Sequence, residues 1–105
     1  MQYNRLKKQA DFQKLFHKGK RVHTSSLSIV YSPCEKMTMG ISVGKKHGTS
    51  VQRNRIKRLL REAFRAVQDS MQGSYSIVLI PKVCEEYSLQ NFTKQLKWII
   101  QKEKL

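Results

Sequence analysis

The spacing of hydrophobic residues predicts one helix and three strands in the first part of the chain. Apolar residues at positions 10, 12, 15 and 16 have helical spacing, and Gly19 is placed to end that helix. Strand-like segments follow at residues 27–32 and 38–43, and residues 20–24 are expected to add a short edge strand before them. A short turn at 33–36 separates the first two of these segments, which therefore read as a β-hairpin.

The second part of the chain contains a longer helix, a strand and a last helix. The long helix follows Thr49 or Ser50, its N-cap candidates. Its apolar face consists of Ile56, Leu59, Leu60, Ala63, Phe64 and Val67. Gly73 marks the end of the segment that contains this helix. Residues 75–80 (YSIVLI) are the clearest strand, and Pro81 ends it. The last helix starts at Ser88, and its expected buried stripe consists of Leu89, Phe92, Leu96, Ile99 and Ile100.

The resulting order, α-β-β-β-α-β-α around one small sheet, indicates an α+β fold arranged as an α/β sandwich. A chain of 105 residues corresponds to a single domain, here 1–105. Residues 1–8 are polar and basic, and we expect them to form an extended basic arm.

The net charge of this domain limits the kinds of partner that it can bind. Twenty-one Lys and Arg residues against seven Asp and Glu residues give a net charge of +14, which favours a polyanionic partner. A membrane partner is disfavoured, because no apolar run approaches the ~20 residues that span a bilayer and no signal peptide is visible. Cys34 and Cys84 lack CxxC spacing and are expected to be reduced thiols of a cytoplasmic protein, although one disulfide is arithmetically possible.

Half of this net charge lies between residues 45 and 65, which hold eight Lys and Arg residues and one acid, Glu62. We call the polar and cationic positions of this segment the basic ridge: Lys45, Lys46, Arg53, Asn54, Arg55, Lys57, Arg58, Arg61 and Arg65. A charged helix face can simply be solvated, but one acid is too few to pair these cations at i, i+4 spacing. The ridge therefore predicts phosphate binding, with Lys45 and Lys46 beside a helix N-terminus that also favours anions.

The chain contains few residues that could form a catalytic site. Of the seven acids only Glu85 and Glu86 are sequence neighbours, and the histidines show no metal-ligand spacing. We expect His47 to contact phosphate or solvent. The sequence therefore predicts no catalytic centre, no metal and no cofactor on the chain itself.

Two aromatic residues favour RNA over DNA as the polyanion. No helix-turn-helix or zinc module for reading DNA is apparent. Phe12 and Phe16 stand side by side at i, i+4, near Lys14 and Lys18. They either pack into the core or form a stacking surface for unpaired bases.

These residues resemble a known family. The central motif consists of Lys45-Lys46, Gly48, Val51, Arg53-Asn54-Arg55, Lys57-Arg58, Arg61-Glu62 and Phe64. The opening motif consists of Arg5-Leu6, Asp11-Phe12, Phe16 and Gly19. Both, together with the length and the order of strands, are similar to the bacterial ribonuclease P protein component over nearly the whole chain.

The resemblance implies a cytoplasmic ribonucleoprotein that removes the 5′ leader from precursor tRNA. Its partners would be the ribonuclease P RNA, which holds the catalytic magnesium ions, and precursor tRNA, with no DNA and no membrane. The chain would be a subunit of an endoribonuclease, without catalytic residues of its own. The implied fold is ribosomal protein S5 domain 2-like, with a left-handed βαβ crossover.

The resemblance also assigns site residues. The basic ridge would contact the RNA subunit and border its active site, and Phe12, Phe16, Val30 and Lys57 would form a cleft for the single-stranded leader. Family members often carry an aromatic residue where this chain has Val30. Tyr31 lies on the opposite face of the strand, and a slip of one residue would bring it into the cleft instead. The rival interpretations are a ribosomal or RNA-chaperone protein of related fold, and a self-sufficient nuclease.

Overall fold

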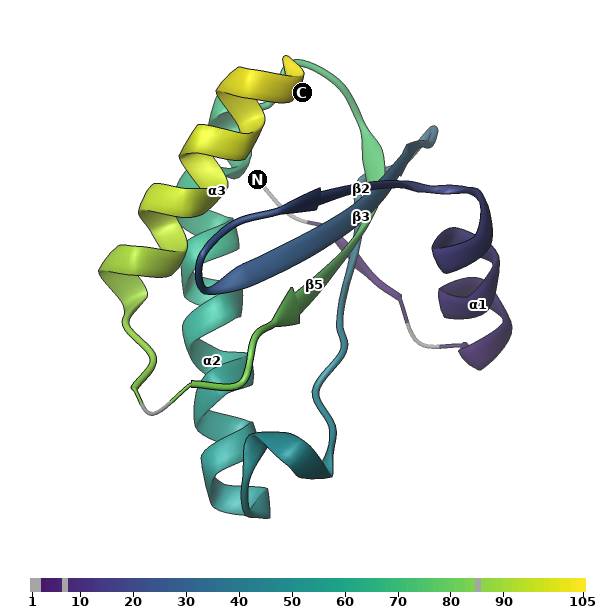
Figure 1. Cartoon of the computed structure of the whole chain (residues 1–105). Helices are drawn as coiled ribbons and strands as arrows, with labels where there is room; N and C mark the ends of the chain where they lie inside the picture. Colours follow the sequence, from purple (N-terminus) through teal and green to yellow (C-terminus); the bar gives the residue numbers. More distant parts are fainter. Residues whose placement is uncertain (1–2, 7, 85) are drawn as a thin grey trace.

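A computed structural model describes residues 3–6, 8–84 and 86–105 of the chain. Its sheet contains five strands: β1 (Asn4–Arg5), β2 (Lys20–His23), β3 (Leu27–Pro33), β4 (Thr38–Ile41) and β5 (Tyr75–Pro81). The helices are α1 (Gln9–Lys18), α2 (Ser50–Val67) and α3 (Leu89–Glu103), with short 3-10 turns η1 (Lys45–His47) and η2 (Gln68–Ser70). The α+β class and the predicted order of helices and strands are confirmed, with β1 added before the first helix (Figure 1).

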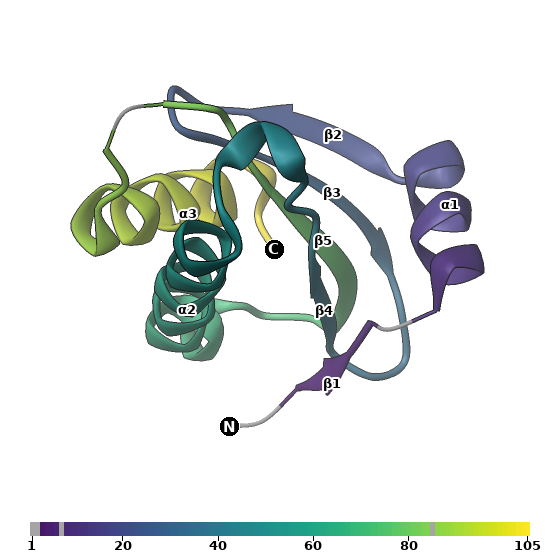
Figure 2. The same ribbon diagram turned by 90° about the horizontal axis from the view of Figure 1, so that it is seen from below.

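The sheet separates two hydrophobic layers of unequal size. Helices α2 and α3 cover one face, and α1 covers the other (Figure 2). Because side chains alternate along a strand, Leu27 and Ile29 of β3 pack into the large core under α2 and α3. Val30 of the same strand joins Val78 of β5 and Leu15 of α1 in a smaller cluster on the opposite face.

The predicted hairpin between residues 27–32 and 38–43 is wrong. Strand β5 lies between β3 and β4, antiparallel to β3 and parallel to β4, in the sheet order β1-β4-β5-β3-β2. The hairpin forms instead between β2 and β3. The most apolar strand takes the central position, because β5 has neighbours on both edges and helices on both faces, where its side chains are best removed from water.

The N-terminal segment is also more ordered than an extended arm. Asn4 and Arg5 pair in parallel with Thr38 and Met39 of β4, so that the chain gains an additional edge strand. Tyr3 packs edge-on against Phe64 of α2, with ring centroids 5.2 Å apart. The free hydrogen-bonding groups along the edge of β4 account for this pairing. Residues 1, 2 and 7 of the predicted arm lie outside the described residues.

Both long helices begin where the sequence predicts. The Thr49 hydroxyl accepts a hydrogen bond from the Gln52 backbone at 3.3 Å, and the Gln52 side chain accepts one from the Thr49 backbone at 2.7 Å. Ser88 caps α3. The expected apolar faces are buried, except that Leu59 of α2 is half-buried and Leu89 of α3 is 37% exposed. Tyr87, which precedes the helix, packs against the core, and its ring lies 5.9 Å from that of Phe92.

The two cysteines are free, exposed and far apart in the fold. The backbone N–H of Cys34 donates to the carbonyl of Ser74, which precedes β5, whereas Cys84 follows the other end of β5. A strand of seven residues separates its ends by about 20 Å, well beyond the reach of a disulfide. The thiols of one chain therefore cannot pair with each other.

Candidate RNA-binding surfaces

A buried histidine positions the first two lysines of the basic ridge. His47 is 6% exposed, so the expected contact with phosphate or solvent is wrong. Its Nδ1 accepts a hydrogen bond from the Gly44 backbone at 3.0 Å, and its Nε2 donates to the carbonyl oxygen of Pro81 at 2.7 Å. The imidazole therefore ties η1 to the end of β5 and leaves Lys45 and Lys46 exposed beside the start of α2.

The turn from η1 into α2 requires a glycine. Gly48 has φ +111°, a left-handed conformation that disfavours residues with a Cβ. A Cβ at this position would also lie 2.1 Å from Oε1 of Gln52, the atom that caps the helix. Gly48 thus keeps the two exposed lysines and the capped N-terminus of α2 in one arrangement.

The basic ridge occupies the outer side and both flanks of α2. Its exposed members on the helix are Asn54, Arg55, Arg58 and Arg65, and its half-buried members are Arg53, Lys57 and Arg61. No ion pair involves a ridge cation among the residues that the structure describes. The outer cations are therefore unneutralised and available to phosphate.

Arg53 stands at the margin between the ridge and the core. Its Nη2 donates to the Ser50 hydroxyl at 3.2 Å. Its Nε is shielded from water and has no hydrogen-bond partner within the described part of the chain. Burial of this donor without a partner carries a desolvation cost, because the hydrogen bond to water is lost and not replaced.

Lys57 and Arg61 line a groove that is formed by α1, α2 and the strands β1 and β4. The cavity measures about 310 Å³ and is lined by Tyr3, Arg5, Leu6, Phe12, Met39, Gly40, Ile41, Lys57 and Arg61. We call it the α1–α2 groove. Its lining includes three cations and the aromatic ring of Phe12, and none of its lining residues is acidic. Tyr3 and Arg5 are absent from the predicted site, because their place in the groove depends on the pairing of β1 with β4.

The floor of this groove depends on Gly40 of β4. A Cβ at Gly40 would lie 2.7 Å from Cζ of Phe12 and 2.9 Å from Cβ of Leu6. The ring of Phe12 therefore rests directly on the backbone of the strand. This contact holds the ring on the side of the groove opposite α2.

The two predicted aromatic residues have different surroundings. The rings of Phe12 and Phe16 lie 6.4 Å apart, and both are half-buried against the small cluster under α1. Core packing therefore accounts for the buried side of each ring, and stacking of unpaired bases on the exposed side stays a prediction. Phe16 does not line the α1–α2 groove, and the guanidinium of Arg21 lies 5.7 Å from its ring centroid.

Val30 is not part of an open cleft. Its side chain is 0% exposed and packs beneath α1 with Leu15 and Val78. The backbone of Gly19 also approaches it so closely that a Cβ there would lie 2.6 Å from Cγ1 of Val30. The prediction that Val30 contacts the leader is therefore wrong, because a short aliphatic side chain at this position is covered by the helix.

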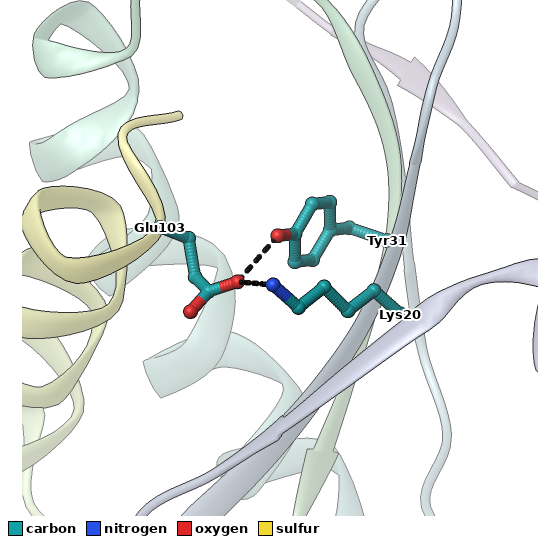
Figure 3. A network of polar contacts seen from close by, with 3 residues as sticks. All are labelled: Lys20, Tyr31 and Glu103. Carbon is teal, nitrogen blue, oxygen red and sulfur yellow. Dashed lines mark hydrogen bonds and ion pairs between the residues drawn. The ribbon is translucent and has the colours of Figure 1, made fainter.

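Tyr31 lies on the other face of the sheet, as the register predicts, and has a structural role there. Its hydroxyl donates to the carboxylate of Glu103 at 2.7 Å, and the same oxygen binds the Lys20 ammonium at 2.6 Å (Figure 3). Burial, and then the hydrogen bond to Glu103, raise the pKa of Tyr31 to about 12. Hydrogen bonds from Lys20 and then from Tyr31 lower the pKa of Glu103. These contacts attach the end of α3 to the sheet and remove Tyr31 from the candidate leader cleft.

Two further classes of site can be assessed for the described residues. No helix among them is long and apolar enough to cross a membrane. Within 3–6, 8–84 and 86–105, no three or more His, Cys, Asp or Glu side chains gather where they could hold a metal ion. The fold and the cationic surfaces thus define a small basic nucleic-acid-binding protein.

Comparison with known proteins identifies the family. The family model described as Ribonuclease P matches residues 1–104. The chain is 36% identical over 104 residues to the ribonuclease P protein component of Staphylococcus carnosus, covering 96% of this chain and 90% of that protein. It is 35% identical to that of Alkaliphilus metalliredigens, covering 97% and 95%. The chain belongs to the ribonuclease P protein family, whose members are protein subunits of a tRNA-processing ribonuclease that also contains an RNA subunit.

Solved structures agree with this assignment. The ribonuclease P protein of Staphylococcus aureus superposes with a TM-score of 0.82 at 30% identity, covering 98% of this chain and 97% of that one. The protein from Thermotoga maritima also has a TM-score of 0.82, at 24% identity, with 94% and 96% covered, and shares the fold.

Proposed function

We propose that this chain holds two RNAs side by side in ribonuclease P. The outer basic ridge and the exposed Lys45 and Lys46 bind the RNA subunit, and the α1–α2 groove binds the single-stranded 5′ leader of precursor tRNA. One observation carries the proposal: Phe12 lines the same cavity as Lys57 and Arg61. An aromatic surface beside cations is the arrangement that binds unpaired nucleic acid, because bases stack on the ring while phosphates meet the charges.

The chemistry of the groove supports a binding role. Its lining contains no carboxylate, imidazole or thiol that could activate water or hold a metal. Cleavage then belongs to the RNA subunit and its magnesium ions, in the cytoplasm. The protein neutralises phosphates where two polyanions approach each other, and it retains precursor tRNA better than mature tRNA because only the precursor has a leader.

Reconstitution tests this function. Adding the chain to a ribonuclease P RNA at low magnesium concentration should restore removal of the leader, whereas the chain alone with magnesium should not cut. A chain that binds the RNA without restoring cleavage would instead be a ribosomal or RNA-chaperone protein of related fold. Cutting by the chain alone would support a self-sufficient nuclease.

The groove is tested separately with substitutions of the two aromatic residues. Phe12→Ala should weaken binding of precursor tRNA about 5- to 150-fold, the range expected for losing one base stack, and should leave mature tRNA nearly unaffected. Phe16→Ala is the matched control outside the groove and should have the smaller effect on the precursor. Equal losses on precursor and mature tRNA would show that Phe12 acts only in packing.

A further inference from the structure

A second hollow lies at the opposite edge of the sheet from the α1–α2 groove. It measures about 480 Å³ and is lined by His23, Thr24, Ser25, Asn91, Lys94, Gln95 and Trp98. The groove adjoins β1 and β4, whereas the residues that line this hollow come from α3 and from the end of β2, the strand at the other edge, and the turn after it. No residue is shared by the linings of the two cavities.

The walls of this hollow are fixed by the side chain of Gln95. Its Oε1 accepts hydrogen bonds from the Ser26 backbone at 3.0 Å and from the Ser26 hydroxyl at 2.8 Å, and it also accepts one from the Thr24 hydroxyl. Its Nε2 donates to the Ser25 hydroxyl at 2.8 Å. One glutamine of α3 thus holds the whole β2–β3 turn, so the hollow is formed before any ligand enters and binding carries little ordering cost.

The rim of the hollow combines an exposed indole with lysines. Trp98 is 48% exposed, although a ring of this size is usually more buried. Lys94 and Lys102 stand one turn before and after it on α3, and the Lys102 ammonium lies 4.7 Å from the ring centroid. Glu103 is the acid of this helix, and its carboxylate points inward to Lys20 and Tyr31. Among the described residues, no ion pair joins Lys94 or Lys102 to a carboxylate.

We propose that this hollow is a second RNA site, which binds an unpaired nucleotide by stacking its base on Trp98. Lys94, which lines the hollow, and the exposed Lys97 and Lys102 of the same helix then bind the adjoining phosphates. The volume lies within the range of small-ligand sites. A polyanion matches the charge of the rim, whereas the core of a protein–protein interface is depleted in lysine. The site is independent of the leader groove, so it binds RNA even where the proposed leader contact fails.

The tryptophan fluorescence of the chain comes from this site alone, because Trp98 is its one tryptophan. Intrinsic fluorescence is followed while the full chain is titrated with single-stranded hexaadenylate at low salt. Saturable quenching is expected, both in the unaltered chain and in the variant Lys57→Ala, Arg61→Ala, which weakens the groove only. Absence of quenching, or its loss in that variant, would overturn the proposal.

Two controls separate stacking from other causes. An abasic oligonucleotide of the same length should leave the fluorescence nearly unchanged, and equal quenching by it would show that charge alone is responsible. The emission of the chain without RNA should not depend on protein concentration. A concentration-dependent shift would assign the exposed ring to contact between copies of the chain, and the proposal would be rejected.

A substitution measures the size of the effect. In the Lys57→Ala, Arg61→Ala background, Trp98→Ala should weaken binding of labelled hexaadenylate about 5- to 150-fold. Leu89→Ala, at another exposed apolar position of α3, should not change it. If Trp98→Ala lowers the melting temperature, the exposed pair Lys94→Gln, Lys97→Gln replaces it and should reduce quenching at fixed RNA concentration. Unchanged affinity or quenching in the folded variants would refute the site.

Discussion

The groove cations should control how strongly salt weakens the binding of precursor tRNA. Lys57 and Arg61 lie one helical turn apart on α2, and both line the α1–α2 groove. Each phosphate contact on a single strand contributes about 0.7 to the slope of log affinity against log salt concentration, because binding releases condensed counterions. Replacing both residues by alanine should therefore make the slope shallower by about 1.4, or slightly more if one contact falls on duplex RNA.

The assay is equilibrium binding of leader-bearing precursor tRNA to the reconstituted holoenzyme across a series of salt concentrations. The matched control is Lys36→Ala, Lys82→Ala, which removes the same formal charge from two exposed positions outside the groove. That control should change the slope little, because only contacts with phosphate release counterions. An equal change in both double variants, or no change in either, would refute the assignment of Lys57 and Arg61 to phosphate.

Three further predictions concern the structure that holds the two surfaces. Glu103→Gln should lower the free energy of unfolding by about 1 kcal/mol at neutral pH, the difference between a charged and a neutral hydrogen bond. Because the folded-state pKa of Glu103 lies below its ordinary value, this stabilisation is present above the ordinary pKa of the carboxyl. It is lost as the pH falls through the folded-state value, so denaturant titrations of the variant and the unaltered chain should converge in acid. Gly40→Ala should cost about 1–3 kcal/mol of stability by displacing Phe12, and precursor affinity should fall while the affinity for the RNA subunit alone is retained. His47→Ala should show the reverse selectivity in binding assays, with weaker binding of the RNA subunit, because η1 loses its attachment to Pro81.

The pairing of strands explains which predictions failed. Residues 27–32 and 38–43 have the local pattern of a hairpin, and nothing within those segments excludes it. The competing partner, β5, follows more than thirty residues later and pairs with both. A strand buried on both faces gains more from the centre of the sheet than a short strand containing Gly40 does.

The sites show the same division between local and distant information. The basic ridge is predictable because periodicity alone places Lys57, Arg58 and Arg61 away from the apolar face of α2. His47 is different, since its buried state depends on the carbonyl oxygen of Pro81, 34 residues away. The resemblance assigns Val30 to a cleft, but its burial depends on the packing of α1 and of the backbone of Gly19 against it.

The sequence by itself determined the helices, the strands other than β1, the N-caps of α2 and α3 and the charge of α2. Those properties depend on residues within one or two helical turns, where spacing and side-chain chemistry act directly. The motifs along nearly the whole chain also indicated the family. Only the tertiary structure decided that β1 pairs with β4 and that Arg5 and Phe12 share a groove with Lys57. It also placed Trp98 beside the β2–β3 turn, through the hydrogen bonds of Gln95. These arrangements arise when distant segments compete to bury apolar surface and satisfy backbone groups, and no local pattern encodes the outcome.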